Sequence, residues 1–84
     1  MSKTIYRREH DILLELLKKH RKASGLTQVE CSRALNRPQS FMSDIETGSR
    51  RLDIIQLRDL CNILRIDLRT LISELEDSIS NEKI

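Results

Sequence analysis

Four polar residues near the middle of the chain have side chains that can read the edges of DNA bases. They are Gln39, Ser40, Ser43 and Asp44. If residues 38–47 form a helix, Met42 and Ile45 face inward, three positions apart, and the polar residues project from the other side. Glutamine can pair with adenine through two hydrogen bonds, serine can bond to any base, and aspartate can accept from the amino group of cytosine. This pattern favours a helix that fits the major groove, although an ordinary solvated face looks the same.

Cationic and polar residues flank this predicted helix. Arg37 lies before Pro38, and Ser49, Arg50 and Arg51 follow the helix in a polar loop. Exposed arginines with no acidic run beside them are suited to contacts with phosphates. Such contacts fix the register of a protein on DNA but carry no sequence information. We therefore expect Arg37, Ser49, Arg50 and Arg51 to contact the DNA backbone.

A second short helix is predicted just before this one, over residues 27–35. Thr27 and Glu30 lie three positions apart, as in a capping box, where each side chain accepts a hydrogen bond from the backbone N–H of the other residue. The residues expected to face inward at helical spacing are Val29, Ser32 and Leu35. This helix would support the one that follows it.

Only a few residues separate the two predicted helices. Asn36 tolerates the left-handed conformation that ends a helix, and Pro38 biases Arg37 away from the helical region. Pro38 itself fits the first turn of a helix, where its missing N–H is no loss. Gly48 is suited to ending the second helix. Two helices joined by so short a turn have the layout of a helix-turn-helix.

Three longer helices and two chain ends complete the single predicted domain. They are an arm over residues 1–6, helices over 7–24, 53–64 and 68–79, and a tail over 80–84. Gly25 supplies a left-handed stop, Asp53 and Gln56 form a second capping box, and Asp67 caps the last helix. The buried stripe of the 53–64 helix is expected to be Ile54, Leu57, Leu60, Cys61 and Leu64. Many Leu and Ile residues and only 2% aromatic residues favour an all-α fold.

The charge is distributed unevenly along the chain. The net charge of +2 says little by itself. The first 51 residues carry eleven Lys and Arg against six Asp and Glu, a balance of +5, whereas the rest carry four against seven, a balance of −3. The basic part contains the predicted helix-turn-helix, as a surface that binds nucleic acid requires.

Several other classes of protein are disfavoured. The N-terminal residues contain no apolar run and no stretch approaches the length of a membrane span, so a cytoplasmic protein without a membrane segment is expected. Cys31 and Cys61 lie on apolar helical faces and His10 and His20 are far apart, which favours buried reduced thiols over a metal site. No phosphate-binding glycine loop and no nucleophile with a positioned base is evident, so neither an enzyme nor a cofactor is expected.

The segment GLTQVECSRALNRPQSFMSDIETGSRRLD resembles the signature of the lambda-repressor/Cro-like, or XRE-type, helix-turn-helix family. The resemblance covers residues 16–71 without a gap. It implies a compact five-helix bundle, DNA binding by the third helix, and commonly a homodimer on a near-palindromic operator. By position, Gln28 would contact a phosphate, and Arg21 would pair with Glu46. The residues that would meet base edges are Gln39, Ser40 and Ser43.

Four residues depart from the pattern of that family. Cys31 stands where leucine is frequent, Ser32 where a helix-packing alanine is usual, and Asn36 where a glycine forms the turn. Asp44 stands where a basic residue is often found. Because phosphates repel a carboxylate, Asp44 is expected either to accept from a cytosine amino group or to pair with a neighbouring arginine.

The last predicted helix carries more apolar residues than a small core needs. Leu71, Leu75 and Ile79 continue its stripe and are expected to meet the same helix of a second copy in a twofold interface. The alternative is an acidic tail that frays after Leu75. With the resemblance, the chain is expected to be a DNA-binding transcriptional regulator, most simply a homodimeric repressor. The rival hypothesis is a protein-interaction module, such as the antitoxin of a toxin–antitoxin pair, with a protein partner at the acidic end.

Overall fold

The computed structural model describes residues 2–82, with side chains from Arg8 onward. Five α-helices and no strands make up this part of the chain. The helices are α1 (Ser2–Ala23), α2 (Gln28–Ala34), α3 (Phe41–Thr47), α4 (Ile54–Leu64) and α5 (Leu68–Glu82). The predicted all-α class is therefore confirmed.

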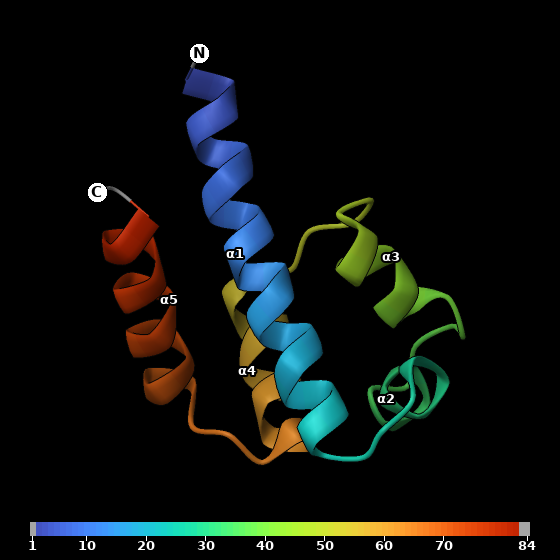
Figure 1. The fold of residues 1–84 in the computed structure, drawn as a ribbon. Coiled ribbons are helices and arrows are strands. Elements are labelled where there is room, and N and C mark those ends of the chain that lie inside the picture. The colour runs from blue at the N-terminus through green and yellow to red at the C-terminus, as the bar shows by residue number, and fades with distance from the viewer. Residues whose placement is uncertain (1, 83–84) are drawn as a thin grey trace.

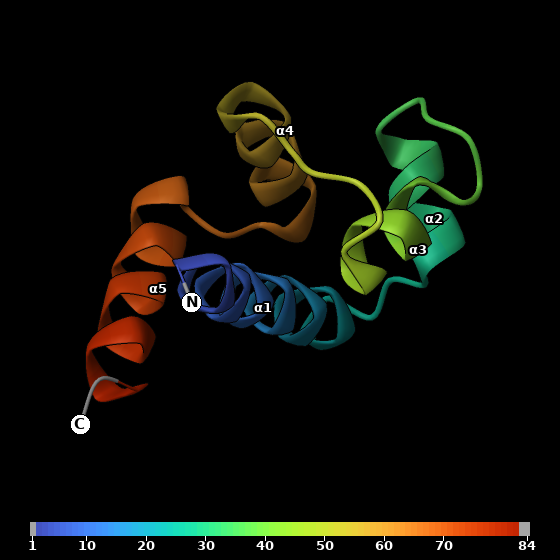
Figure 2. The ribbon, with the colours of Figure 1, turned by 90° about the horizontal axis from the view of Figure 1, so that it is seen from above.

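Helix α1 is the axis about which the other helices are arranged (Figure 1). It packs against α5 and against α3, and α4 lies behind it and contacts α5. Seen from above, α5 and the α2–α3 pair lie on opposite sides of α1 (Figure 2). Helix α2 contacts both α3 and α4. The helix-turn-helix is thus joined to the rest of the bundle through α1 and α4.

The core lies where the five helices meet, and every helix contributes to it. Its fully buried side chains are Leu17, Cys31, Ser32, Met42, Ile45, Leu60, Cys61 and Leu71. A completely buried leucine stabilises a fold by roughly 1.5–3 kcal/mol. Because Leu71 is 0% exposed, it packs inside this chain and is not accessible to a second copy. The structure thereby corrects its expected place in a dimer interface, whereas Leu75 and Ile79 are only half-buried.

Local sequence signals set most of the helix ends. Both predicted capping boxes are present, at Thr27 with Glu30 and at Asp53 with Gln56. The predicted left-handed residues are Gly25, Asn36 and Gly48, with φ angles of 76°, 58° and 85°. Arg65 adopts the same conformation after α4, with φ of 61°, although no turn residue announces it. As a result, α2 and α4 lie within one residue of their predicted bounds at each end.

Polar contacts fix the lower ends of α1, α4 and α5 in Figure 1 to one another. The His20 ring nitrogen Nε2 lies 2.7 Å from Glu74 Oε1, which links α1 to α5. Ser24 Oγ donates to the Leu64 carbonyl at 3.0 Å, which links the end of α1 to the end of α4. These contacts hold the three helices in register around the core.

Both ends of the chain are more helical than predicted. Residues 2–6 of the expected arm belong to α1, and α5 continues to Glu82 instead of ending at residue 79. Arg8 Nε and Nη2 donate to the two Glu82 carboxylate oxygens at 3.1 and 2.8 Å. This contact joins stretches that are far apart in the sequence, so neither stretch alone predicts it. Residue 1 of the arm and residues 83 and 84 of the tail lie outside the described residues.

Helix α3 starts later than predicted. It begins at Phe41, and residues 38–40 form a turn in which the Phe41 N–H donates to the Pro38 carbonyl at 2.9 Å. Pro38 therefore opens a turn and not the helix itself. Gln39 and Ser40, which were expected on the helix, project from this turn.

Two apolar side chains that were expected to face inward are exposed. Val29 is 37% exposed and Ile54 is 58% exposed. Each lies in the first turn of its helix, ahead of the residues that reach the core. The prediction of their burial was wrong. Helical spacing shows which face of a helix points inward, but it does not show whether the first turn of the helix reaches the core.

Candidate nucleic-acid interface

Helix α3 presents a buried face and an accessible one. The buried side chains, none more than 3% exposed, are Phe41, Met42 and Ile45. The accessible candidates are Gln39 and Ser40, exposed in the turn, and Ser43 and Asp44, partly exposed in the first turn of the helix. The expected inward and outward division of α3 is therefore present, with two candidates on the turn and two on the helix.

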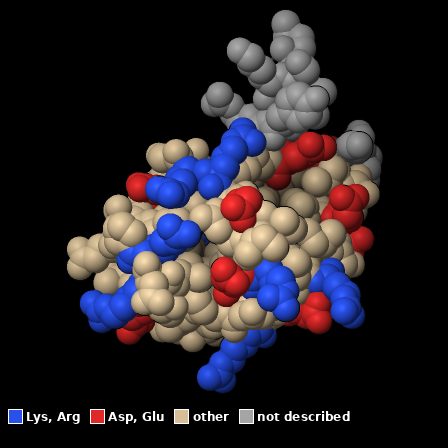
Figure 3. Space-filling view, turned by 180° about the vertical axis from the view of Figure 1, so that it is seen from behind, with Lys and Arg blue, Asp and Glu red and all other residues tan. Residues whose placement is uncertain are grey.

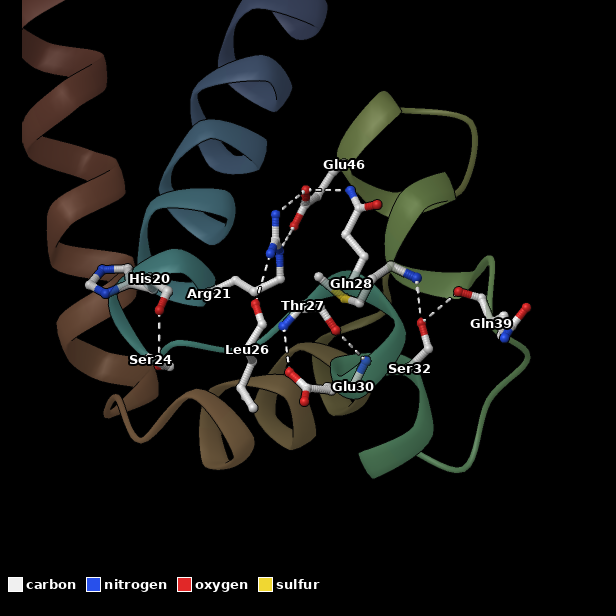
Figure 4. A network of polar contacts seen from close by, with 11 residues as sticks. His20, Arg21, Ser24, Leu26, Thr27, Gln28, Glu30, Ser32, Gln39 and Glu46 are labelled. Atoms are coloured by element: carbon white, nitrogen blue, oxygen red, sulfur yellow. Dashed lines mark hydrogen bonds and ion pairs between the residues drawn. The ribbon is translucent and has the colours of Figure 1, made fainter.

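A buried hydroxyl from α2 holds the turn before α3. Ser32 Oγ accepts from the Met42 N–H at 2.9 Å and donates to the Gln39 carbonyl at 3.2 Å (Figure 4). Ser40 occupies the N-cap position of α3 but makes no side-chain capping bond. Ser32 therefore supplies, from a neighbouring helix, the acceptor that an N-cap side chain usually provides. Sequence reasoning missed this role, although a hydroxyl at a position expected to be buried always needs a partner.

The Arg21–Glu46 ion pair is present and joins α1 to α3. Arg21 Nε donates to Glu46 Oε2 at 2.6 Å, and Nη2 donates to Oε1 at 3.2 Å. The two side chains are only 9% and 4% exposed. Arg21 Nη1 also donates to the Leu26 carbonyl at 2.8 Å (Figure 4). One guanidinium therefore connects α1, the loop before α2 and the end of α3.

Gln28 completes this cluster. Its Nε2 donates to Glu46 Oε1 at 2.8 Å. Burial by itself would raise the pKa of Glu46, but the hydrogen bonds from Arg21 and Gln28 and the charge of Arg21 outweigh it and hold that pKa below its ordinary value. The expected phosphate contact of Gln28 stays a prediction. Its amide nitrogen carries two hydrogens, and the bond to Glu46 uses one of them.

Two arginines from different loops lie over the Phe41 ring. The guanidinium carbon of Arg37, before α3, is 5.4 Å from the ring centroid, and that of Arg50, after α3, is 5.2 Å from it. These are the distances of cation–π contacts. The Arg50 N–H also donates to the Asp44 carbonyl at 3.1 Å, which folds the loop back onto α3. One aromatic ring thus orients two candidate phosphate ligands, a link that no sequence spacing revealed.

The remaining candidates of this region are also accessible. Ser49 and Arg51 are exposed in the loop after α3, and Ser49 Oγ lies 3.1 Å from Thr47 Oγ1. Among the described residues, the Asp44 carboxylate forms no ion pair. The expected alternative in which Asp44 pairs with a neighbouring arginine is therefore not observed, and its side chain stays available to a base.

Charged side chains of both signs are scattered over the face of the molecule opposite to that of Figure 1. Figure 3 shows Lys and Arg prominent on the side where α2 and α3 lie, with Asp and Glu interspersed. On this face the basic side chains therefore do not form a continuous patch. Attraction to phosphates would depend on individual side chains near α3.

Comparison with known proteins identifies this arrangement. Residues 12–75 match a family model described as a helix-turn-helix domain. An XRE-family like protein from Pseudomonas syringae pv. tomato str. DC3000 has 43% sequence identity and a TM-score of 0.85, over 92% of this chain and 94% of that chain. The chain belongs to the XRE-type helix-turn-helix family.

A second solved structure shares the XRE-type fold. The clp gene regulator ClgR from Corynebacterium glutamicum is 20% identical, with a TM-score of 0.77 over 89% of this chain and 80% of that chain. Comparison with curated proteins gives no significant match. The chain therefore shares the fold of the XRE-type helix-turn-helix DNA-binding family. Among the described helices, none has both the length and the apolar character needed to cross a membrane.

The departures from the XRE pattern are accommodated by the fold. Asn36 takes the left-handed conformation of the turn glycine that it replaces, at φ 58°. Cys31 is 0% exposed and Cys61 is 1% exposed, as expected for buried thiols. Burial raises the pKa of both thiols, so the reactive thiolate is disfavoured. Neither cysteine is thus part of an exposed reactive site.

Proposed function

We propose that this XRE-type chain is a sequence-specific DNA-binding regulator in which the turn over residues 38–40 and helix α3 enter the major groove. Other parts of the fold hold this accessible polar segment firmly in place, and this observation supports the proposal. Ser32 holds its first turn, Arg21 holds its end through Glu46, and the apolar side chains of α3 fix it in the core. A surface that reads bases must be rigidly positioned, whereas a surface that only contacts solvent needs no such support.

Within this proposal, the residues divide into two roles. Gln39, Ser40 and Ser43 contact base edges, and Asp44 accepts from a cytosine amino group. The contacts to phosphates come from Gln28, Arg37, Ser49, Arg50 and Arg51. The two arginines over Phe41 lie before and after α3, so together they would set its depth and angle in the groove.

The regulator acts, on this proposal, as a cytoplasmic homodimeric repressor on a near-palindromic operator. Dimeric helix-turn-helix proteins place their two recognition helices about one helical turn apart. The most exposed of the large apolar side chains described are Ile54 and Ile55, at 58% and 63%. They lie at the start of α4, directly after the loop with the candidate phosphate ligands. This position favours them over the half-buried Leu75 and Ile79 as the contact with a second copy.

The same exposed isoleucines support one rival function. An antitoxin-like module would use such a surface to bind a different protein, and DNA contact would be secondary. The two functions differ in what they require of the DNA. A regulator needs an operator with sequence preference, and an interaction module does not.

Selection of bound duplexes from a random pool at near-physiological salt tests the proposal. We expect enrichment of an inverted repeat whose half-sites lie about one helical turn apart. An enriched single half-site would support sequence reading but contradict the dimer. A folded protein that enriches no sequence would contradict the regulator and favour the interaction module.

A further inference from the structure

Ser32 fixes the backbone on both sides of Gln39. Its carbonyl accepts from the Arg37 N–H at 2.9 Å, where the turn begins. Its hydroxyl bonds to the Gln39 carbonyl at 3.2 Å and to the Met42 N–H at 2.9 Å, where the turn passes into α3. Figure 4 shows the hydroxyl next to the Gln39 backbone, with the Gln39 side chain directed away from α2. One residue of the preceding helix therefore helps to hold the backbone that carries Gln39.

We propose that Ser32 is a positioning residue for base recognition, which acts through Gln39 and does not touch the DNA. Ser32 is 0% exposed, so a direct contact with a base or a phosphate is excluded. The inference rests on the proposed function, because it concerns the residue assigned there to read a base. An alanine at this position would have no hydroxyl and would leave the turn without these two bonds.

Loss of the hydroxyl affects only one part of the interface. In a Ser32→Ala variant, the backbone bond between Ser32 and Arg37 remains, and so does the capping box of α2. The buried Met42 N–H loses its acceptor, and the turn must shift to give it a new one. Gln39 lies in the part that shifts. The Arg50 backbone, which is bonded to the Asp44 carbonyl, lies outside it.

The variant should therefore lose specificity and keep its general affinity for DNA. On the operator selected with the wild-type protein, Ser32→Ala should bind about tenfold more weakly, the effect of one lost hydrogen bond. On random duplexes of the same length, the loss should stay below about twofold, because phosphate contacts supply that affinity. The slope of affinity against salt should not change.

Two further variants separate positioning from a contribution to stability. In a Gln39→Ala background, Ser32→Ala should cause a smaller loss on the operator than it causes in the wild type, because the two residues act through a shared contact. Ser32→Thr retains the hydroxyl and crowds the core with a methyl group. We expect it to lower the thermal stability while it keeps the operator-to-random affinity ratio of the wild type.

Cys31→Ala provides a matched control. Cys31 is the neighbouring residue on α2, it is equally buried, and within the described residues its thiol makes no hydrogen bond to the turn. Its truncation destabilises the same helix by loss of packing. All variants are compared below their unfolding transitions, and we expect Cys31→Ala to keep the wild-type affinity ratio.

The possible results distinguish this inference from the function on which it rests. A wild-type protein without sequence preference would overturn both. If the wild type prefers an operator, an equal loss for Ser32→Ala on operator and random DNA would overturn the inference alone. So would an additive effect with Gln39→Ala, or an equal loss of specificity in Cys31→Ala.

Discussion

Gln39 is exposed in the turn before α3 and has a side chain suited to one base pair. We predict that Gln39→Ala weakens binding to the operator by roughly 1–3 kcal/mol and leaves binding to random DNA unchanged. Fluorescence titration with both duplexes at one salt concentration measures the two affinities. Equal losses on the two duplexes would show that Gln39 contacts the backbone and not a base.

Arg50 should show the opposite behaviour. Its guanidinium is held over Phe41 and its proposed ligand is a phosphate, which is present in every sequence. We predict that Arg50→Ala weakens binding to all duplexes alike and reduces the slope of log affinity against log salt by about one. Titrations at several salt concentrations give this slope. A loss confined to the operator would assign Arg50 to base reading.

Phe41 links the core to the phosphate ligands. In Phe41→Leu, the core keeps an apolar residue, but Arg37 and Arg50 lose the ring over which they lie. Because an exposed cation–π contact contributes about 0.5–1 kcal/mol, binding to operator and random DNA should weaken together by up to roughly 1–2 kcal/mol.

Met42→Leu is the control for this prediction, since it changes a fully buried neighbour on α3 that carries no aromatic ring. Isothermal titration should find its affinities close to those of the wild type. If Phe41→Leu and Arg50→Ala lower the affinity by fully additive amounts, the ring does not act through Arg50.

At the scale of helices, the Arg21–Glu46–Gln28 cluster makes the contact between α1 and α3 dependent on pH. The pKa of Glu46 is held below its ordinary value, so its charged form is favoured by folding. Its contribution to stability is therefore complete above the unfolded pKa of about 4.3 and disappears as the pH falls through the lower pKa of the folded state. We predict a decrease in the free energy of unfolding as the pH falls through this acidic range.

Urea unfolding of the wild type and Glu46→Gln between pH 7 and pH 3 measures this effect. Glu46→Gln removes the charge, leaves Arg21 without its buried partner, and should lower stability by several kcal/mol at pH 7. The difference between the two proteins should shrink as the pH falls. A difference that is constant over this range would mean that Glu46 titrates alike in the folded and unfolded states.

Sequence reasoning predicted the helices where the signals are local. Thr27 with Glu30 and Asp53 with Gln56 needed only a spacing of three, and Asn36 and Gly48 needed only their tolerance of positive φ. The start of α3 was missed because Pro38 is equally suited to a turn and to the first turn of a helix. For the site, the ion pair came from family resemblance, and the accessible polar positions came from helical spacing.

The contacts that hold the site in place could not be predicted from the sequence, because they join residues that have no fixed spacing. The Ser32 hydroxyl reaches Met42 across a turn, and Arg50 reaches the Phe41 ring from the following loop. Their geometry exists only after α2 and α3 have packed. The burial of Leu71 was misjudged for a related reason, since a helical stripe does not show which of its residues meets the core of the same chain.

For the molecule as a whole, the exposed start of α4 should determine the oligomeric state. We predict that Ile55→Glu shifts the protein from dimer to monomer, because the 63% exposed side chain leaves room for the charge in the monomer but not in an apolar interface. Sedimentation equilibrium at several concentrations measures this shift. Ile79→Glu is the comparison variant on α5. Dissociation by Ile79→Glu alone would move the interface to α5.

The two buried cysteines make it possible to measure how fast two parts of the protein open. Cys31 lies in α2 and Cys61 lies in α4, and each can react with a thiol reagent only after its surroundings have opened. Reagents such as Ellman's compound would therefore report the rates at which the two parts of the molecule loosen. Equal rates would mean that the recognition unit opens only when the whole bundle does. Faster labelling at Cys31 would mean that α2 opens locally while α4 remains packed.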